Sequence, residues 1–143
     1  MIKFIDNRIE VSKALDKKAI AFLHEAKDSL VSQTQRNTPV QTGDLKRSFG
    51  NDSMVDESSL IAYIGSSLEY AIWVERGTGE YAVNGDGRKG GWCYKDEKGK
   101  VHFTKGMKPK KMLYNAYITK KKKIQEQANK IYKEMNSIWK SCY

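Results

Sequence analysis

Length, composition and charge exclude several classes of protein. The chain has 143 residues, enough for one domain with a hydrophobic core. Hydrophobic residues make up 39% of it and charged residues 30%, as in soluble globular proteins. No apolar run approaches the roughly 18–20 residues of a membrane span, and Asp6 interrupts the N-terminus too early for a signal peptide. We therefore predict a single domain over residues 1–143, in a cytosolic setting and away from membranes.

Charge is distributed unevenly along the chain. The formal net charge is +9. Residues 105–143 contain eleven lysines and two acids, Glu126 and Glu134, whereas residues 1–104 carry 15 basic and 15 acidic side chains. The last segment therefore holds the whole net charge. This asymmetry indicates either an anionic partner for the C-terminal segment or a helix face exposed to water.

An amphipathic helix is predicted over residues 12–37. Its apolar side chains recur at spacings of three and four residues and so form one stripe. The stripe consists of Leu15, Ala19, Phe22, Leu23, Ala26 and Leu30. Ser12 or Asp16 is a suitable N-cap, and Pro39 disfavours helical geometry at the residue before it. Residues 1–11 alternate apolar and polar positions, which favours a short strand or hairpin.

An antiparallel sheet of about four strands is predicted to pack against this helix, which makes the fold class α+β. Residues 46–67 are predicted to supply two of the strands, at 46–55 and 59–67. Residues 92–104 are predicted to supply a β-hairpin, because two strand-like runs flank the turn Asp96–Gly99.

Residues 77–91 are predicted to form a flexible loop. This segment holds six of the eleven glycines in the chain, and glycine has a low tendency to become ordered. The short apolar segment just before it, residues 70–75, is compatible with either a strand or a helix.

A long basic helix is predicted over residues 108–141, with Pro109 in its first turn. Its apolar positions follow steps close to a heptad repeat, and Lys121 falls on the same seam. The seam consists of Tyr117, Ile124, Ala128, Ile131, Met135 and Ile138. Two arrangements are compatible with it: the helix packs on its own domain, or its second half packs on another chain.

No catalytic, metal or cofactor site is predicted. Gly85–Gly90 matches the letters of a dinucleotide-binding motif, but a hairpin follows it where that motif requires a helix. His24 and His102 have no partner at metal-ligand spacing, and Cys93 and Cys142 are predicted to be free thiols. The remaining candidate carboxylates are spread over different predicted elements: Asp44, Glu69, Glu75 and Glu80. We therefore expect a protein that is not an enzyme.

Four consecutive lysines stand out in the last helix: Lys120, Lys121, Lys122 and Lys123. Successive helix residues point in different directions, so only some of the four can face one partner. They are compatible with a solvated helix face, or with contact to an acidic partner or to DNA phosphates without sequence preference.

Three short motifs occur in order along the chain. They are P-V-x-T-G-x-L-x-x-S from Pro39, Y-A-x-x-V-E-x-G-T from Tyr70, and G-x-x-P-x-x-M-L-x-x-A from Gly106. In this order, and with these elements between them, they resemble the tail-component or neck protein family of long-tailed phages and prophages. The resemblance covers about residues 12–118. The positions that carry it are Pro39, Thr42, Gly43, Leu45, Tyr70, Trp73, Glu75, Gly77, Gly79, Gly106, Pro109 and Leu113.

The resemblance implies a structural protein of the head–tail joint, either a tail-completion protein or a connector. It implies partners among phage tail-tube and head-connector proteins, and assembly into a ring, preferably a hexamer, around the DNA channel. The expected locations are the host cytoplasm during assembly and the head–tail interface of the virion, and a monomer in solution is compatible with this role. The alternative is a small basic DNA-binding protein that uses the lysine run.

The motif residues are expected to have structural roles. Gly43 and Gly77 are expected to adopt backbone angles that other residues resist. Five further residues are expected to fill the core against Phe22 and Leu30, and the loss of Trp73 is expected to be strongly destabilising. These five are Leu45, Trp73, Val74, Met112 and Leu113.

Overall fold

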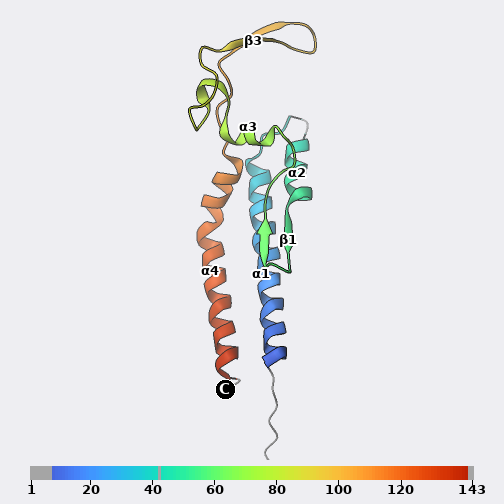
Figure 1. The fold of residues 1–143 in the computed structure, drawn as a ribbon, viewed down its shortest axis with the longest axis vertical. Coiled ribbons are helices and arrows are strands. Elements are labelled where there is room, and N and C mark those ends of the chain that lie inside the picture. The colour runs from blue at the N-terminus through green and yellow to red at the C-terminus, as the bar shows by residue number, and fades with distance from the viewer. Residues whose placement is uncertain (1–7, 42, 142–143) are drawn as a thin grey trace, which may run out of the picture.

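Two long helices form a stalk in the computed structural model, which describes residues 8–41 and 43–141 (Figure 1). Helices α1 (Arg8–Asn37) and α4 (Met112–Ser141) lie side by side and run in opposite directions. Neither contains glycine or proline, so each keeps an uninterrupted helical backbone over its 30 residues. Both long helices predicted from the sequence are therefore confirmed.

The boundaries of the two helices differ from the predicted ones. α1 already includes Ile9 and Val11, so the strand predicted over residues 1–11 is wrong from residue 8 onward, and residues 1–7 lie outside the described part. α4 begins at Met112 and leaves Pro109 outside its first turn. The reason is local, because Lys111 has a φ of 50° and so cannot continue a right-handed helix.

The packing of α4 against α1 explains the apolar seam. Five of the six predicted seam residues are half-buried, namely Ile124, Ala128, Ile131, Met135 and Ile138. Lys18 Nζ lies 3.4 Å from Glu134 Oε2, and Gln127 Nε2 donates a hydrogen bond of 2.8 Å to Glu25 Oε1. The described part of α4 therefore packs along α1 of the same chain, and no sheet lies beneath it.

Two residues were assigned wrongly to that seam. Tyr117 is 48% exposed, and Lys121 lies over its ring, with Nζ at 5.7 Å from the ring centroid. Lys120 is half-buried instead, in line with Met112, Ala116 and Ile124 at steps of four. The predicted heptad step from Tyr117 to Ile124 fails because the start of α4 follows this four-residue stripe.

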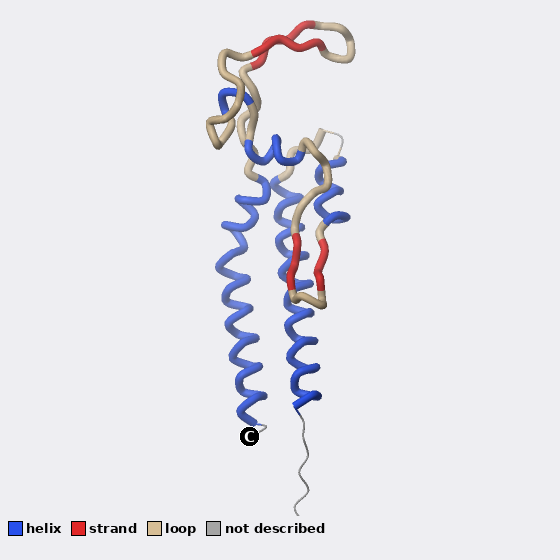
Figure 2. The backbone as a smooth tube through the Cα atoms, viewed as in Figure 1, coloured by secondary structure: helices blue, strands red, loops and turns tan. Residues whose placement is uncertain are grey.

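Short elements cover α1 beside α4: one lies on the side of α1 away from α4, and a hairpin lies across the front of α1 in the view of Figures 1 and 2. They are α2 (Asp44–Asp52), β1 (Met54–Asp56) and β2 (Ile61–Tyr63). The strand predicted at 46–55 is wrong over most of its length, because Leu45, Ser48 and Phe49 lie at helical spacing and bury one face of α2. The predicted strand at 59–67 shrinks to the three residues of β2.

The strands form two separate hairpins, so the predicted sheet of about four strands is wrong. β1 pairs with β2 so that Met54 faces Tyr63. β3 (Trp92–Lys95) and β4 (Val101–Thr104) form the predicted hairpin around Asp96, in the head at the far end of the molecule (Figure 2). Mixed α+β composition is confirmed, but the helix does not pack on a continuous sheet.

We call residues 71–111 the head. It begins with the short helix α3 (Ala71–Arg76) and a single turn of 3-10 helix at Gly79–Tyr81, and it contains the β3–β4 hairpin. Residues 70–75 thus enter a helix, one of the two options that the sequence left open. In the hairpin, His102 Nε2 lies 2.9 Å from Asp96 Oδ2, and this hydrogen bond lowers the pKa of the Asp96 carboxyl.

The most tightly packed core lies where the head meets the stalk. Leu45, Phe49 and Met112 are buried together, and around them pack the half-buried residues Leu68, Ala71, Val74 and Leu113. Four of the five predicted core residues are therefore confirmed. Trp73 is not, because it is 58% exposed. Phe22 and Leu30 lie outside this cluster and are half-buried along α1.

Candidate functional site

The family motifs converge on the junction between head and stalk. Gly43 has a φ of 83° and is the N-cap of α2, and its carbonyl accepts a hydrogen bond of 3.0 Å from the Arg47 amide. The side chain of Leu45 then reaches the buried cluster with Met112. Pro39 is exposed in the turn after α1, and Thr42 lies outside the described residues. The first motif thus starts α2 and anchors it to the start of α4.

The second and third motifs pair backbone to backbone. The Thr78 amide donates to the Met107 carbonyl at 2.9 Å, and the Glu80 amide donates to the Lys105 carbonyl at 2.8 Å. Gly79 is buried here with a φ of 62°, and a Cβ at this position would overlap the Lys105 carbonyl. A Cβ on Gly106 would overlap the Thr78 carbonyl in the same way, and one on Gly77 would crowd the Met107 carbonyl and Pro109. The glycines therefore allow two chain segments to touch.

Glu75 binds the N-terminus of α4. Its carboxylate accepts hydrogen bonds of 3.0 Å from both the Leu113 and the Tyr114 amides, and its backbone carbonyl accepts one of 3.2 Å from the Lys111 amide. First-turn amides have no partner within their own helix, and a negative charge also complements the helix dipole. Glu75 therefore ties α3 to the stalk and acts as a cap from outside the helix.

Replacing Glu75 by Ala should lower the free energy of unfolding by about 1–3 kcal/mol, because two α4 amides lose a charged acceptor. Glu75→Gln should cost less, because its amide oxygen keeps one of the two bonds. Urea denaturation followed by circular dichroism measures the change. The matched control is Glu69→Ala, at an exposed position just before α3, and an equal loss in both variants would contradict the capping role.

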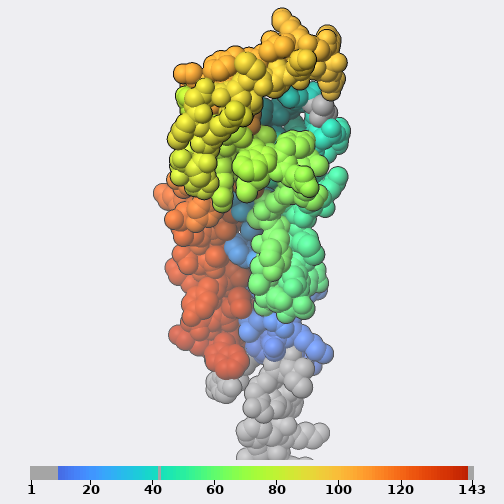
Figure 3. Space-filling model, turned by 45° about the horizontal axis from the view of Figure 1, so that its top comes forward, coloured from blue at the N-terminus to red at the C-terminus, as the bar shows by residue number. Residues whose placement is uncertain are grey.

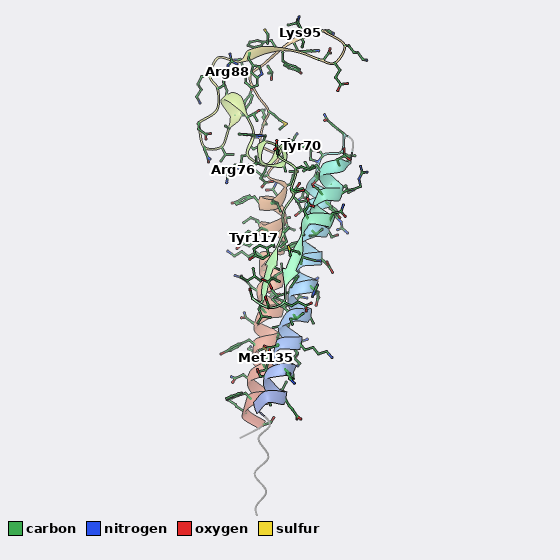
Figure 4. The ribbon with its side chains drawn as sticks, turned by 45° about the vertical axis from the view of Figure 1, so that its right-hand side comes forward. Tyr70, Arg76, Arg88, Lys95, Tyr117 and Met135 are labelled. Atoms are coloured by element: carbon green, nitrogen blue, oxygen red, sulfur yellow. The ribbon has the colours of Figure 1, made fainter. Side chains whose placement is uncertain are left out.

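Next to this junction lies an open hollow of about 420 Å³. Its apolar lining comes from Ile72 and Trp73 of α3 and from Val83. Arg76 and Arg88 supply charge, and Figure 4 labels both of them in the head, with Tyr70 just before it. Ile72, Trp73 and Val83 are each about half exposed, at 47%, 58% and 55%. The motif residue Trp73 therefore belongs to a surface and not to the core.

Comparison with protein families gave one match. Residues 2–77, more than half of the chain, match the model of the family described as bacteriophage HK97-gp10, putative tail-component. The chain belongs to this family. The match includes the first motif and the second up to Gly77, whereas the third motif, from Gly106, lies beyond it. No curated protein and no solved structure matched the chain.

Membership makes the protein a phage tail component and implies contacts with other phage structural proteins. The tail component has three exposed lysines in its lysine run, Lys121, Lys122 and Lys123, while Lys120 is half-buried. Of the four lysines predicted to contact DNA or an acidic protein, only some can therefore meet one partner.

The described residues also bear on three predictions: no metal site, free cysteine thiols and no membrane span. Within residues 8–41 and 43–141, no three side chains among His, Cys, Asp and Glu come together as metal ligands. Cys93 of the tail component is a free, exposed thiol, and Cys142 lies outside the described part. None of the described helices is long and apolar enough to cross a bilayer.

Sequence reasoning missed the exposed apolar residues of this tail component. Tyr114 and Ile118 are 57% and 53% exposed, and Tyr132 is 69% exposed. They lie on the face of α4 turned away from α1 and recur at steps of four and fourteen residues. This helical periodicity was available as a signal, but the stronger inner seam concealed it.

Proposed function

We propose that the tail component acts at the head–tail joint, as a tail-completion or connector protein that forms a ring around the DNA channel. The proposed role is structural and not catalytic. The observation that carries it is the apolar surface that a single copy leaves exposed. Large apolar side chains such as Phe103, Val40 and Tyr132 are more than 60% exposed, at 63%, 64% and 69%. Exposed apolar residues that gather in one place, as Ile72, Trp73 and Val83 do around the hollow beside the junction, are typical of protein–protein contact sites.

The total surface area supports the same conclusion. The chain exposes 10820 Å², against about 7500 Å² for a typical folded monomer of its mass. The ten residues outside the described part account for at most about half of the difference, even as free chain. A chain that exposes this much surface is suited to burying it in an assembly.

The finer features of the proposal follow from the family resemblance. The ring is preferably a hexamer, with the tail tube on one side and head-connector proteins on the other. Assembly takes place in the host cytoplasm, the final location is the head–tail interface of the virion, and single copies associate only weakly and transiently in solution until the tail tube recruits them. Closed rings need two different complementary surfaces on each copy, which a molecule with apolar residues on both flanks can provide.

A test is negative-stain electron microscopy of the purified protein mixed with tail tubes that lack it. We expect density that caps one end of each tube. Tubes that already carry the native protein are the control, and they should gain no density. Bare tube ends after mixing would overturn the proposed role.

The alternative function is a small DNA-binding protein that uses α4. The specific observation in its favour is that Lys121, Lys122 and Lys123 are exposed close to Tyr114 and Tyr117. Lysine contacts to phosphates give an affinity that falls steeply with salt. In the same micrographs, bare tube ends together with protein on added duplex DNA would favour this alternative, provided that substitution of the run by Glu abolishes the DNA binding.

A further inference from the structure

One flank of the molecule is acidic. Residues 48–75 carry five acidic side chains and no Lys, Arg or His. Four of them lie on α2, around the β1–β2 turn and just before α3, and with the outward residues of β1 and β2 they form what we call the acidic face. These four are Asp52, Asp56, Glu57 and Glu69.

Hydrogen bonds fix two carboxylates of the acidic face, and those to Asp56 hold it in its charged form. Asp56 accepts hydrogen bonds from the Ser58 hydroxyl at 2.6 Å and from the Ser58 and Ser59 amides, which lower its pKa to about 2. Asp52 accepts from the Ser67 amide and hydroxyl at 2.7 and 2.9 Å. Glu57 Oε1 lies 3.1 Å from Nε2 of His24 in α1. The face therefore stays negative at neutral pH.

Apolar side chains stand among these charges. In the β1–β2 register, Met54 faces Tyr63 and Asp56 faces Ile61, so these four side chains share the outward side of the hairpin. Met54 is 58% exposed and Tyr63 52%. An acidic rim around exposed apolar residues is the composition of a contact surface.

The opposite flank of the molecule is basic. The outward side of α4 carries Tyr114, Ile118 and Tyr132, and between and beside them lie lysines that make no ion pair within the described chain. Glu134 faces Lys18 of α1, and the other acid of α4, Glu126, lies four residues after Lys122, so Lys121, Lys122 and Lys133 still leave this side with a net positive charge. We call this surface the basic face, defined by Tyr114, Ile118, Lys121, Lys122, Tyr132 and Lys133.

The two faces lie on different sides of one molecule. α1 packs against both α4 and the α2–β1–β2 layer, and in Figures 1 and 3 α4 lies to the left while the layer lies to the right and in front. We propose that the basic face of one copy docks on the acidic face of the next copy, so that α4 is the contact between neighbours in the ring. This inference rests on the proposed function and names the two surfaces that join neighbouring copies in the ring.

Charge complementarity selects a second copy as the occupant of the basic face. Two basic faces in a twofold dimer would repel each other, whereas a basic and an acidic face attract. Because the two faces are different, each copy can bind one neighbour on either side, and the contact repeats around a ring. DNA would satisfy the lysines but would leave the apolar residues of both faces exposed.

Charge reversal tests this contact. Lys122→Glu/Lys133→Glu reverses the basic face, and Glu57→Lys/Glu69→Lys reverses the acidic face. Each variant alone should lose at least about 10-fold in self-association at low salt, because like charges then meet. An equimolar mixture of the two variants should recover association, since every contact again joins opposite charges. Sedimentation velocity over a wide concentration range measures these changes.

Cross-linking provides a second readout that detects transient contacts. A carbodiimide joins lysine amines to carboxylates, and mixing unlabelled with ¹⁵N-labelled wild-type protein identifies links between copies. We expect links from α4 lysines to Glu57 or Glu69. The absence of such links at the highest concentration reached would overturn the proposal. The proposal would also be overturned if self-association fell only in the variant with the reversed basic face. That result would indicate a different anionic partner for this face, such as duplex DNA.

Controls separate this contact from general charge effects and from the proposed function. Lys13→Glu/Lys17→Glu, at exposed positions of α1, and Asp86→Lys/Glu97→Lys in the head change the net charge equally and should leave association intact. If both reversed variants still cap tail tubes, the contact is wrong and the head–tail role stands. If wild-type copies link through these faces but leave the tubes bare, the contact stands and the role is wrong.

Discussion

Replacing Phe49 by Ala should lower the free energy of unfolding by about 3–5 kcal/mol. Phe49 is 1% exposed and packs with Leu45 and Met112, so its removal leaves a cavity where three elements meet. This is a large part of the stability of a domain of this size, which is about 5–15 kcal/mol. Thermal or urea unfolding followed by circular dichroism measures the loss.

The matched control for Phe49 is Trp73→Ala. Trp73 is the larger residue and belongs to a family motif, but it is 58% exposed, so its removal should cost less than about 1 kcal/mol. If Trp73→Ala destabilised the protein as much as Phe49→Ala, the core would not lie where the structure places it. Retained stability of Trp73→Ala combined with lost assembly would instead assign this residue to an interface.

Replacing Gly79 by Ala should disrupt the head. The new Cβ would overlap the Lys105 carbonyl, so the backbone bonds from Thr78 to Met107 and from Glu80 to Lys105 must open. We expect a loss of at least about 2–3 kcal/mol, together with faster amide exchange at Thr78 and Glu80.

Gly85→Ala separates the free-energy cost of a positive φ from the cost of steric overlap at the Cβ. Gly85 has a φ of 69°, close to the 62° of Gly79, but a Cβ there meets nothing within 4 Å. It should therefore cost only the left-handed conformation of alanine, roughly 1–2 kcal/mol. Equal losses in the two variants would show that close contact between the segments contributes nothing.

The long helices were predictable because their apolar residues repeat at helical spacing over many turns. The β3–β4 hairpin was predictable from the turn at Asp96–Gly99, which sits between two runs of strand-like residues. α2 was missed because it is only nine residues long, and its buried face consists of Leu45, Ser48 and Phe49. One of these is polar: the Ser48 hydroxyl is accommodated through a hydrogen bond of 2.8 Å to the Leu45 carbonyl and another of 2.6 Å with the Ser66 hydroxyl.

The candidate surfaces were predictable only in part. The positive charge of α4 and the absence of basic residues from 48–75 can be read from the sequence. Their placement on different flanks depends on how α4 and the α2–β1–β2 layer pack against α1, which composition does not encode. Trp73 misled the prediction because large aromatic residues are usually buried. The role of Glu75 requires a pairing over 38 and 39 positions in the chain, which no local pattern indicates.

The stalk joins segments from distant parts of the chain, and this has a consequence for synthesis. Asn37 and Met112 are 75 positions apart, yet Asn37 Nδ2 donates a hydrogen bond of 3.2 Å to the Met112 carbonyl. On the ribosome, α1 emerges first, and the side of it that packs against α4 has no native cover until α4 follows. The local hairpins can close in microseconds, whereas the helix pair must wait for tens of residues to be translated at about 5–20 residues per second. During those seconds the nascent chain presents a lone amphipathic helix, which is the form that chaperones and premature self-association would meet first.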